Sequence, residues 1–240
     1  MTTRIETIAA PDGGSFDGDV VLPGGSSGPG ILLLQEIFGV GPYIRAVGDR
    51  LAALGYVVLM PGVFWRIERR VALEHTEESL EKAFALGGRF AEVFDEGIGD
   101  LGAALETLRG LPEVRAGVGV LGFCLGGRLA WSVASRFDAD AVVSYYGSGI
   151  VGALDEADQI TCPILLHFGT ADPYIPKDQI DQITARVEGR PNFEIARHEG
   201  AGHAFDNHEA AMFHQAACGG GVEADRGVPL PPPSPDALTR

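Results

Sequence analysis

Basic residues, cysteines and long apolar runs are all scarce in this chain. Its 240 residues include 18 Lys and Arg against 33 Asp and Glu, which gives a formal net charge of −15. Such a balance repels a phosphate backbone, so we expect no nucleic-acid partner. No apolar run approaches the roughly 20 residues of a membrane helix, and the N-terminus lacks a signal-peptide pattern. We therefore expect a cytoplasmic protein without a membrane partner.

The cysteines number only three, Cys124, Cys162 and Cys218. An odd and sparse set argues against a disulfide framework, and the absence of a C-x-x-C pair removes support for a zinc site. We expect no metal and no organic cofactor. Cys162 lies just before an apolar run and is interpreted as a small buried core residue, since free cysteine is among the most buried residue types.

Short apolar runs alternate with helical patterns through most of the chain. The runs are rich in branched residues, which is typical of strands buried on both faces of a parallel sheet. The alternation predicts an α/β fold with helices on both faces, and the turn PDGG between the first two runs predicts an N-terminal antiparallel hairpin. We expect strands at 4–10, 15–23, 29–36, 56–61, 118–123, 141–147, 163–170 and 192–199, and helices at 43–54, 76–90, 92–110, 125–136 and 176–188.

One domain, residues 1–218, accounts for this pattern, because neither an internal repeat nor a linker interrupts it. Residues 219–240 are rich in glycine and proline and lose all periodicity. Glycine and proline disfavour a helix there. Two interpretations of this tail stay open, a flexible extension and a slip of the reading frame near Cys218.

The stretch VGVLGFCLGGRLA, residues 118–130, places Cys124 at the corner between a predicted strand and a predicted helix. A Gly-x-nucleophile-x-Gly sequence at such a corner is typical of a nucleophile elbow, in which small neighbours let strand and helix approach closely. The N-terminus of the following helix favours a thiolate and a developing oxyanion, because it carries a partial positive charge and free N–H groups. The other interpretation is a glycine-rich turn with a buried cysteine.

An acid and a histidine follow at the ends of later strands. Asp172 comes after strand 163–170 in GTADPYIP, and His203 lies in EGAGHAF after strand 192–199. Catalytic groups gather at the carboxyl ends of strands in open α/β sheets, and nucleophile, acid, histidine is the order of a known triad arrangement. Alone, Asp172 could be a helix cap. The other histidines fit this role less well: His75, His167, His198, His208 and His214.

Taken in order, these motifs resemble the dienelactone hydrolase family of α/β-hydrolases. The matching stretches cover most of residues 5–205 and include LLLQEIFGV, GYVVLMPGVF, VGVLGFCLGG, HFGTADPYIP and EGAGHAF. The resemblance implies the α/β-hydrolase fold, with a mostly parallel central sheet. It also implies a triad of Cys124, His203 and Asp172.

The same resemblance assigns roles to the QEIFG loop. It implies that Glu36 lies near the thiol of Cys124 and helps control its protonation. It further implies that the backbone N–H groups of Ile37 and Leu125 form the oxyanion hole. A carboxylate at the end of an apolar strand is costly to bury unpaired, so a solvated charge is the other interpretation of Glu36.

The substrate site departs from the family pattern. Dienelactone-cleaving members hold the substrate carboxylate with two arginines, one of them four residues after the catalytic histidine, where this chain has Asn207. The segment EHTEESLEKAF, around the second position, contains no arginine. Arg66, Arg69 and Arg70 could supply the charge or could form a solvated loop. The candidate substrate-binding residues are Phe38, Trp65, Arg66, Tyr146 and Asn207.

The sequence thus predicts a hydrolase that opens a small lactone or an enol or activated ester through a cysteine nucleophile. A general short-chain carboxylesterase or thioesterase stays open as an alternative, as does a non-catalytic receptor for a small ligand on the same fold. The expected partner is the ester or lactone itself, and the expected assembly is a monomer or a weak homodimer.

Overall fold

A computed structural model describes residues 2–207 of the chain. Eight strands of this part form a mostly parallel sheet in the order β1-β2-β4-β3-β5-β6-β7-β8. The predicted α/β fold with an N-terminal antiparallel hairpin is therefore confirmed. The chain divides into two compact units, the first ending at Val120 and the second beginning at Leu121, within strand β5 (Val114–Phe123). The predicted tail, 219–240, lies outside the described residues.

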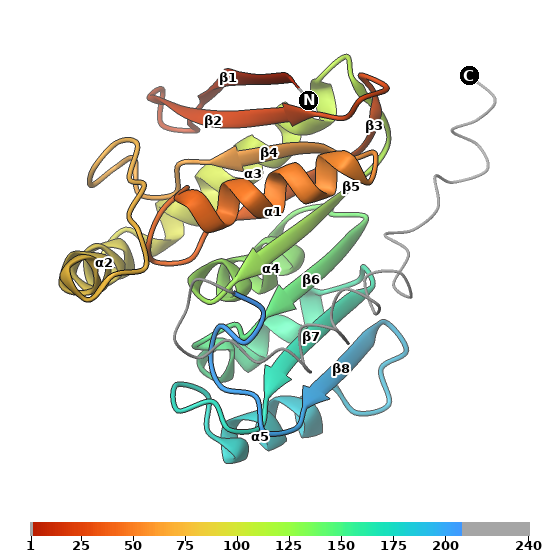
Figure 1. The fold of residues 1–240 in the computed structure, drawn as a ribbon. Coiled ribbons are helices and arrows are strands. Elements are labelled where there is room, and N and C mark those ends of the chain that lie inside the picture. Colours follow the sequence, from red (N-terminus) through yellow and green to blue (C-terminus); the bar gives the residue numbers. More distant parts are fainter. Residues whose placement is uncertain (1, 208–240) are drawn as a thin grey trace. The chain divides into compact units, whose positions relative to one another are not determined.

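The first unit starts with the hairpin, whose strands run side by side (Figure 1). Its turn is closed by Asp12, whose side chain accepts a hydrogen bond from the N–H of Gly14 at 3.0 Å, and Gly13 adopts a φ of 90° that favours glycine. The elements of this unit are β1 (Thr2–Ala9), β2 (Ser15–Leu22), β3 (Gly28–Leu34), α1 (Pro42–Ala53), β4 (Val57–Pro61), α2 (Glu77–Ala91), α3 (Phe94–Gly110) and the first part of β5.

Strands β3 and β4 form the buried centre of the first unit. They pair in parallel, and every residue of β4 and the last five of β3 are buried. Helices α1 and α3 pack against these strands. The unbroken apolar runs in the sequence arise because both faces of each strand are covered.

Besides the end of β5, the second unit contains three strands that run parallel to one another, drawn green to blue in Figure 1. Strand β7 pairs in parallel with β6 on one side and with β8 on the other. The carboxyl ends of these strands therefore lie along one edge, and the loops that follow them meet there. The elements are the end of β5, α4 (Leu125–Arg136), β6 (Ala141–Tyr145), the 3₁₀ helix η1 (Ile150–Gln159), β7 (Ile164–Gly169), α5 (Lys177–Val187) and β8 (Phe193–His198).

Most elements differ from the predicted bounds by one or two residues at an end, and three differences have a local cause. Strand β5 starts at Val114, four residues before the predicted start at residue 118. The apolar run did not reveal these four residues, because they are only partly buried or exposed. Strand β6 ends at Tyr145, since the next residue turns away with a positive φ. The 3₁₀ helix η1 was not predicted; Gly149, with φ of 94°, begins it, and only three of its ten residues are buried. No helix within residues 2–207 is long and apolar enough to cross a bilayer.

Candidate active site

Cys124 lies at the corner between β5 and α4, where the sequence predicted a nucleophile elbow. Its φ of 53° is in the left-handed region, which L residues other than Asn and Asp adopt rarely, and its N–H donates to the carbonyl of Tyr145 at 3.0 Å. A Cβ on Gly122 would lie 2.0 Å from the carbonyl oxygen of Gly126. Glycine is therefore required at residue 122, because strand and helix touch backbone to backbone there. The corner leaves Cys124 half-exposed at the N-terminus of α4.

His203 and Asp172 form a buried pair beyond the ends of β8 and β7. The imidazole Nδ1 lies 2.7 Å from Oδ2 of the carboxylate, and the Asp172 side chain is fully buried. The other carboxylate oxygen accepts the backbone N–H groups of Tyr174 at 2.8 Å and Ile175 at 3.2 Å. Asp172 thus closes a turn before α5 and orients the imidazole, but it is not the helix cap of the alternative interpretation, because the N-cap of α5 is Pro176.

The imidazole of His203 is held in its charged form. Burial opposes that charge, but hydrogen bonds to the Asp172 carboxylate and to the Cys124 side chain outweigh burial and raise the pKa of His203 to about 10. At neutral pH an imidazolium therefore lies beside the Cys124 sulfur. Such a cation stabilises negative charge on a neighbouring sulfur and has a proton to donate. The structure thus brings together the three residues of the predicted triad.

Tyr146 and Asn207 lie near the triad but offer little surface. Tyr146 is fully buried, with its ring 4.9 Å from the His203 imidazole, and its hydroxyl donates to Asp206. Asn207 is also fully buried, and its N–H donates to the carbonyl of Ala204 at 3.0 Å. Neither side chain is exposed as a pocket wall would be, so their predicted contact with substrate stays a prediction.

Glu36 lies in the first unit, two residues past β3, and is buried rather than solvated. Its carboxylate is 2.7 Å from Nε2 of His75, and only 4% of its side chain is exposed. The His75 ring also contacts the ring of Phe38, with centroids 4.2 Å apart. Interpretation of Glu36 as a solvated strand-end charge is therefore wrong. Ile37, in the same loop, is half-buried.

Trp65 and Arg66 converge on Asp100 of α3 in the first unit. The indole N–H donates to Asp100 at 2.8 Å, and two guanidinium nitrogens of Arg66 donate to its two oxygens at 2.7 and 2.8 Å. A further nitrogen of Arg66 donates to Asp12 at 2.6 Å. The hydrogen bonds to Asp100 and Asp12 raise the pKa of Arg66 above its ordinary range. Trp65 stacks on Phe16, so these residues anchor the loop 62–71 to α3 and β2.

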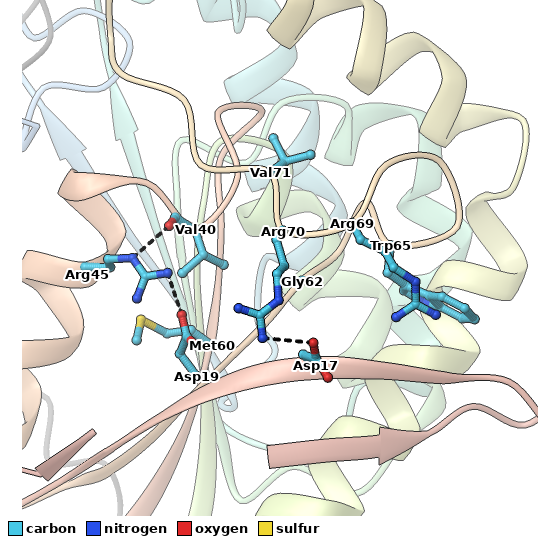
Figure 2. A pocket seen from close by; sticks show the side chains of 10 residues that line it. All are labelled: Asp17, Asp19, Val40, Arg45, Met60, Gly62, Trp65, Arg69, Arg70 and Val71. Atoms are coloured by element: carbon cyan, nitrogen blue, oxygen red, sulfur yellow. Dashed lines mark hydrogen bonds and ion pairs between the residues drawn. The ribbon is translucent and has the colours of Figure 1, made fainter. Parts of the chain in front are cut away.

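A pocket that is open to solvent lies beside this loop in the first unit (Figure 2). Arg45 and Asp19 form an ion pair of 2.6 Å across it, and Arg70 and Asp17 form one of 3.0 Å. Arg69 donates to a backbone carbonyl at 2.8 Å and lies over an indole ring. Two of the three arginines that line the pocket are thus compensated by carboxylates of β2.

The other cysteines and histidines have separate surroundings. Cys162 is half-buried rather than buried as predicted, and desolvation raises the pKa of its thiol to about 11. His167 is fully buried in β7, and its Nδ1 lies 2.9 Å from Nε2 of His198. Burial lowers the pKa of His167 to about 3, so this imidazole is neutral. Three predicted or considered residues lie outside the described part: Cys218, His208 and His214.

Sequence reasoning missed three residues that contact candidate site residues. His75 precedes the nucleophile in the chain and so does not fit the order of the triad, although a histidine can pair with a carboxylate from any position in the chain. Asp100 carried a signal, since it lies among the buried positions of α3 where an unpaired carboxylate would be costly. Asp206 carried none, because its partner is 60 residues away.

The sequence profile named the Dienelactone hydrolase family matches residues 16–223. The chain is 33% identical over 217 residues to a carboxymethylenebutenolidase of a Pseudomonas species, covering 90% of each chain. It is 32% identical over 211 residues to carboxymethylenebutenolidase 1 of Cupriavidus pinatubonensis, covering 88% of this chain and 89% of the relative. A crystal structure of a dienelactone hydrolase-like promiscuous phosphotriesterase from metagenomic libraries superposes with a TM-score of 0.77 at 20% identity, covering 95% and 97% of the two chains.

Proposed function

Since the chain belongs to the dienelactone hydrolase family, we propose that it opens a small lactone or an enol or activated ester with Cys124 as the nucleophile. That the protein is a hydrolase of lactone or ester bonds follows from its carboxymethylenebutenolidase relatives. One observation carries the proposal about the nucleophile, the contact of His203 with both the Asp172 carboxylate and the Cys124 side chain.

In the first half of the reaction, the Cys124 thiolate attacks the carbonyl carbon and forms a tetrahedral intermediate. The C–O bond then breaks, and the imidazolium of His203 gives its proton to the leaving oxygen, which leaves a thioester on Cys124. Asp172 keeps Nδ1 of the imidazole protonated, so that the other ring nitrogen handles the proton. In a lactone, the leaving oxygen stays attached to the acyl group.

In the second half, water attacks the thioester carbon. Neutral His203 takes a proton from that water, the C–S bond breaks, and the carboxylic acid product leaves as its anion. The thiolate and the imidazolium are restored as a pair. A thiolate is itself a good leaving group. The tetrahedral intermediate on Cys124 therefore goes forward more readily when the substrate's leaving group is the oxygen of an activated ester or lactone than when it is the nitrogen of an amide.

The developing oxyanion needs two hydrogen-bond donors. Leu125 is the first residue of α4, and its backbone N–H follows the nucleophile directly, which supports the role predicted for it. The predicted donor role of Ile37 and the predicted control of the thiol by Glu36 rest on the family resemblance and stay predictions.

We expect neutral short-chain esters and lactones to be hydrolysed at least as well as carboxylated ones. Asn207 carries no charge where dienelactone-cleaving members carry an arginine, and an anion buried without a partner is strongly disfavoured. Arg66, one candidate replacement, is already engaged by Asp100 and Asp12. A protein that hydrolyses a carboxylated dienelactone far better than its neutral ester would contradict this expectation.

Turnover of a panel of lactones and p-nitrophenyl esters tests the proposal. We expect a burst of acyl-enzyme formation with p-nitrophenyl acetate, and Cys124→Ala should abolish both the burst and turnover while leaving the circular dichroism spectrum unchanged. Cys162→Ala is the matched control and should keep wild-type activity. More than a tenth of wild-type activity in Cys124→Ala would refute Cys124 as the nucleophile, and binding without any burst would favour the receptor alternative.

A further inference from the structure

The loop that carries His203 is well held at its start. The N–H of Gly200 donates to the hydroxyl of Thr170 at 2.9 Å, and the N–H of Ala171 donates to the carbonyl of Ala201 at 2.9 Å. A Cβ on Gly169 would lie 2.3 Å from that same carbonyl oxygen, so the loop crosses directly over the end of β7. All these contacts precede His203 in the chain. None of these contacts holds the part of the loop that follows His203.

Tyr146 contacts the later part of this loop, from His203 onward. It follows β6 directly, is fully buried and has a φ of 39°, while its N–H donates to the carbonyl of His167 at 2.8 Å. Its ring centroid is 4.9 Å from that of His203 and 5.3 Å from that of Phe205. The ring therefore contacts residues just before and just after the turn at Ala204.

The backbone near Tyr146 is strained at three positions. Within the described part of the second unit, the residues other than glycine with positive φ are Cys124, Tyr146 and Ala204. Such backbone strain persists only where the surrounding structure holds the residue in place. The contact that can hold the strained backbone of Ala204 lies two residues further along the chain, where Oδ1 of Asp206 accepts a hydrogen bond from the Tyr146 hydroxyl.

We propose that Tyr146 and Asp206 form a clasp that positions the His203 imidazole between Asp172 and Cys124. The clasp is the hydrogen bond between the Tyr146 hydroxyl and the Asp206 carboxylate, which holds the part of the loop that follows His203. Both are positioning residues in this proposal, and the predicted contact of Tyr146 with substrate stays a separate prediction. The inference rests on the proposed function and deepens it, since it concerns the same triad.

The clasp matters because His203 must keep two contacts at once. One ring nitrogen bonds Asp172 at 2.7 Å, and the imidazole also bonds the Cys124 side chain. A displacement of about 1 Å is enough to cost about a hundredfold in rate at such a site. Contacts both before and after Ala204 in the chain restrict rotation of the loop there more than contacts before it alone.

Tyr146→Phe and Asp206→Asn test the clasp, because each removes one side of the hydrogen bond and Phe keeps the ring contacts. We expect kcat to fall about tenfold to a hundredfold in each, with KM changed less than about twofold. The double variant should lose little more than either single variant, since both remove the same interaction. Asp181→Asn is the control, because it removes an exposed carboxylate on α5 that pairs with Lys177 and Arg197.

A second readout does not depend on turnover. Among residues 2–207, the ionisable side chains with a recorded contact to His203 are Asp172, Cys124, Tyr146 and Tyr174. The first two raise its pKa, so a loosened imidazole should titrate at lower pH. Proton titration of His203 by NMR, with the signal assigned through His203→Gln, should therefore shift downward in Tyr146→Phe and Asp206→Asn, and stay unchanged in Asp181→Asn.

An unchanged His203 titration in both variants would overturn the clasp. The clasp would also be overturned if activity fell only in proportion to thermal stability while the pH profile of activity stayed unchanged. Failure of the proposed function looks different. In that case the wild type shows neither burst nor turnover on any ester, while the titration still reports whether Tyr146 and Asp206 hold the imidazole.

Discussion

Asp172→Asn is the substitution whose effect the structure defines best. The pKa of His203 lies at about 10 against an ordinary value of 6.5. This difference corresponds to about 5 kcal/mol of preference for the imidazolium, at about 1.4 kcal/mol for each pH unit. His203 is only 7% exposed, so solvent screens this preference little. Burial opposes the charge, and the Asp172 carboxylate is the foremost group that outweighs burial.

Asparagine at residue 172 keeps the size and the turn-capping oxygen but loses the charge. The buried imidazole then loses its proton at neutral pH, and its tautomer is no longer held. Replacing the aspartate of a triad by asparagine lowers kcat about 10⁴-fold, which corresponds to about 5 kcal/mol of transition-state stabilisation. We therefore expect a loss of about four orders of magnitude in kcat with an intact fold.

The assay combines p-nitrophenyl ester turnover with urea unfolding over a range of pH. Because folding raises the pKa of His203, its contribution to the free energy of unfolding is full below pH 6.5 and is lost as the pH rises through about 10. Wild-type stability should therefore fall across this window, and Asp172→Asn should be less stable at neutral pH with a flatter profile. A variant that keeps a tenth of the activity, or the same pH dependence of stability, would refute the reasoning.

Three further predictions follow from other contacts. Iodoacetamide should alkylate Cys124 faster than Cys162, whose thiol has a pKa of about 11, and mass spectrometry of partly labelled protein would contradict this by finding Cys162 labelled first. Asp100→Asn should destabilise the fold by about 3–5 kcal/mol in urea unfolding, since it leaves Arg66 without its buried partner; a change below about 1 kcal/mol would show that the pair is not structural. Asn207→Arg should shift kcat/KM toward carboxylated lactones, and an unchanged ratio for matched acid and neutral ester would contradict it.

Local patterns in the sequence determined most of the elements and the order of the candidate triad. The hairpin, the parallel strands and helices α1 to α5 follow from apolar runs, turn residues and helical spacing. The sequence also predicted the elbow at Cys124, because Gly122 and Gly126 have the spacing that allows strand and helix to contact each other backbone to backbone. Asp172 and His203 were found by their places after strands, since parallel strands bring their carboxyl ends to one edge.

Only the tertiary structure decided which polar side chains pair. Glu36 with His75, Trp65 with Asp100 and Tyr146 with Asp206 are separated by 39, 35 and 60 residues, respectively. No spacing rule links such residues, because a strand or helix pattern repeats every two to four residues and says nothing about which distant elements meet. The burial of Glu36, Asp100 and Tyr146, one partner in each pair, arises only once the elements pack, and the strength of each pair depends on it.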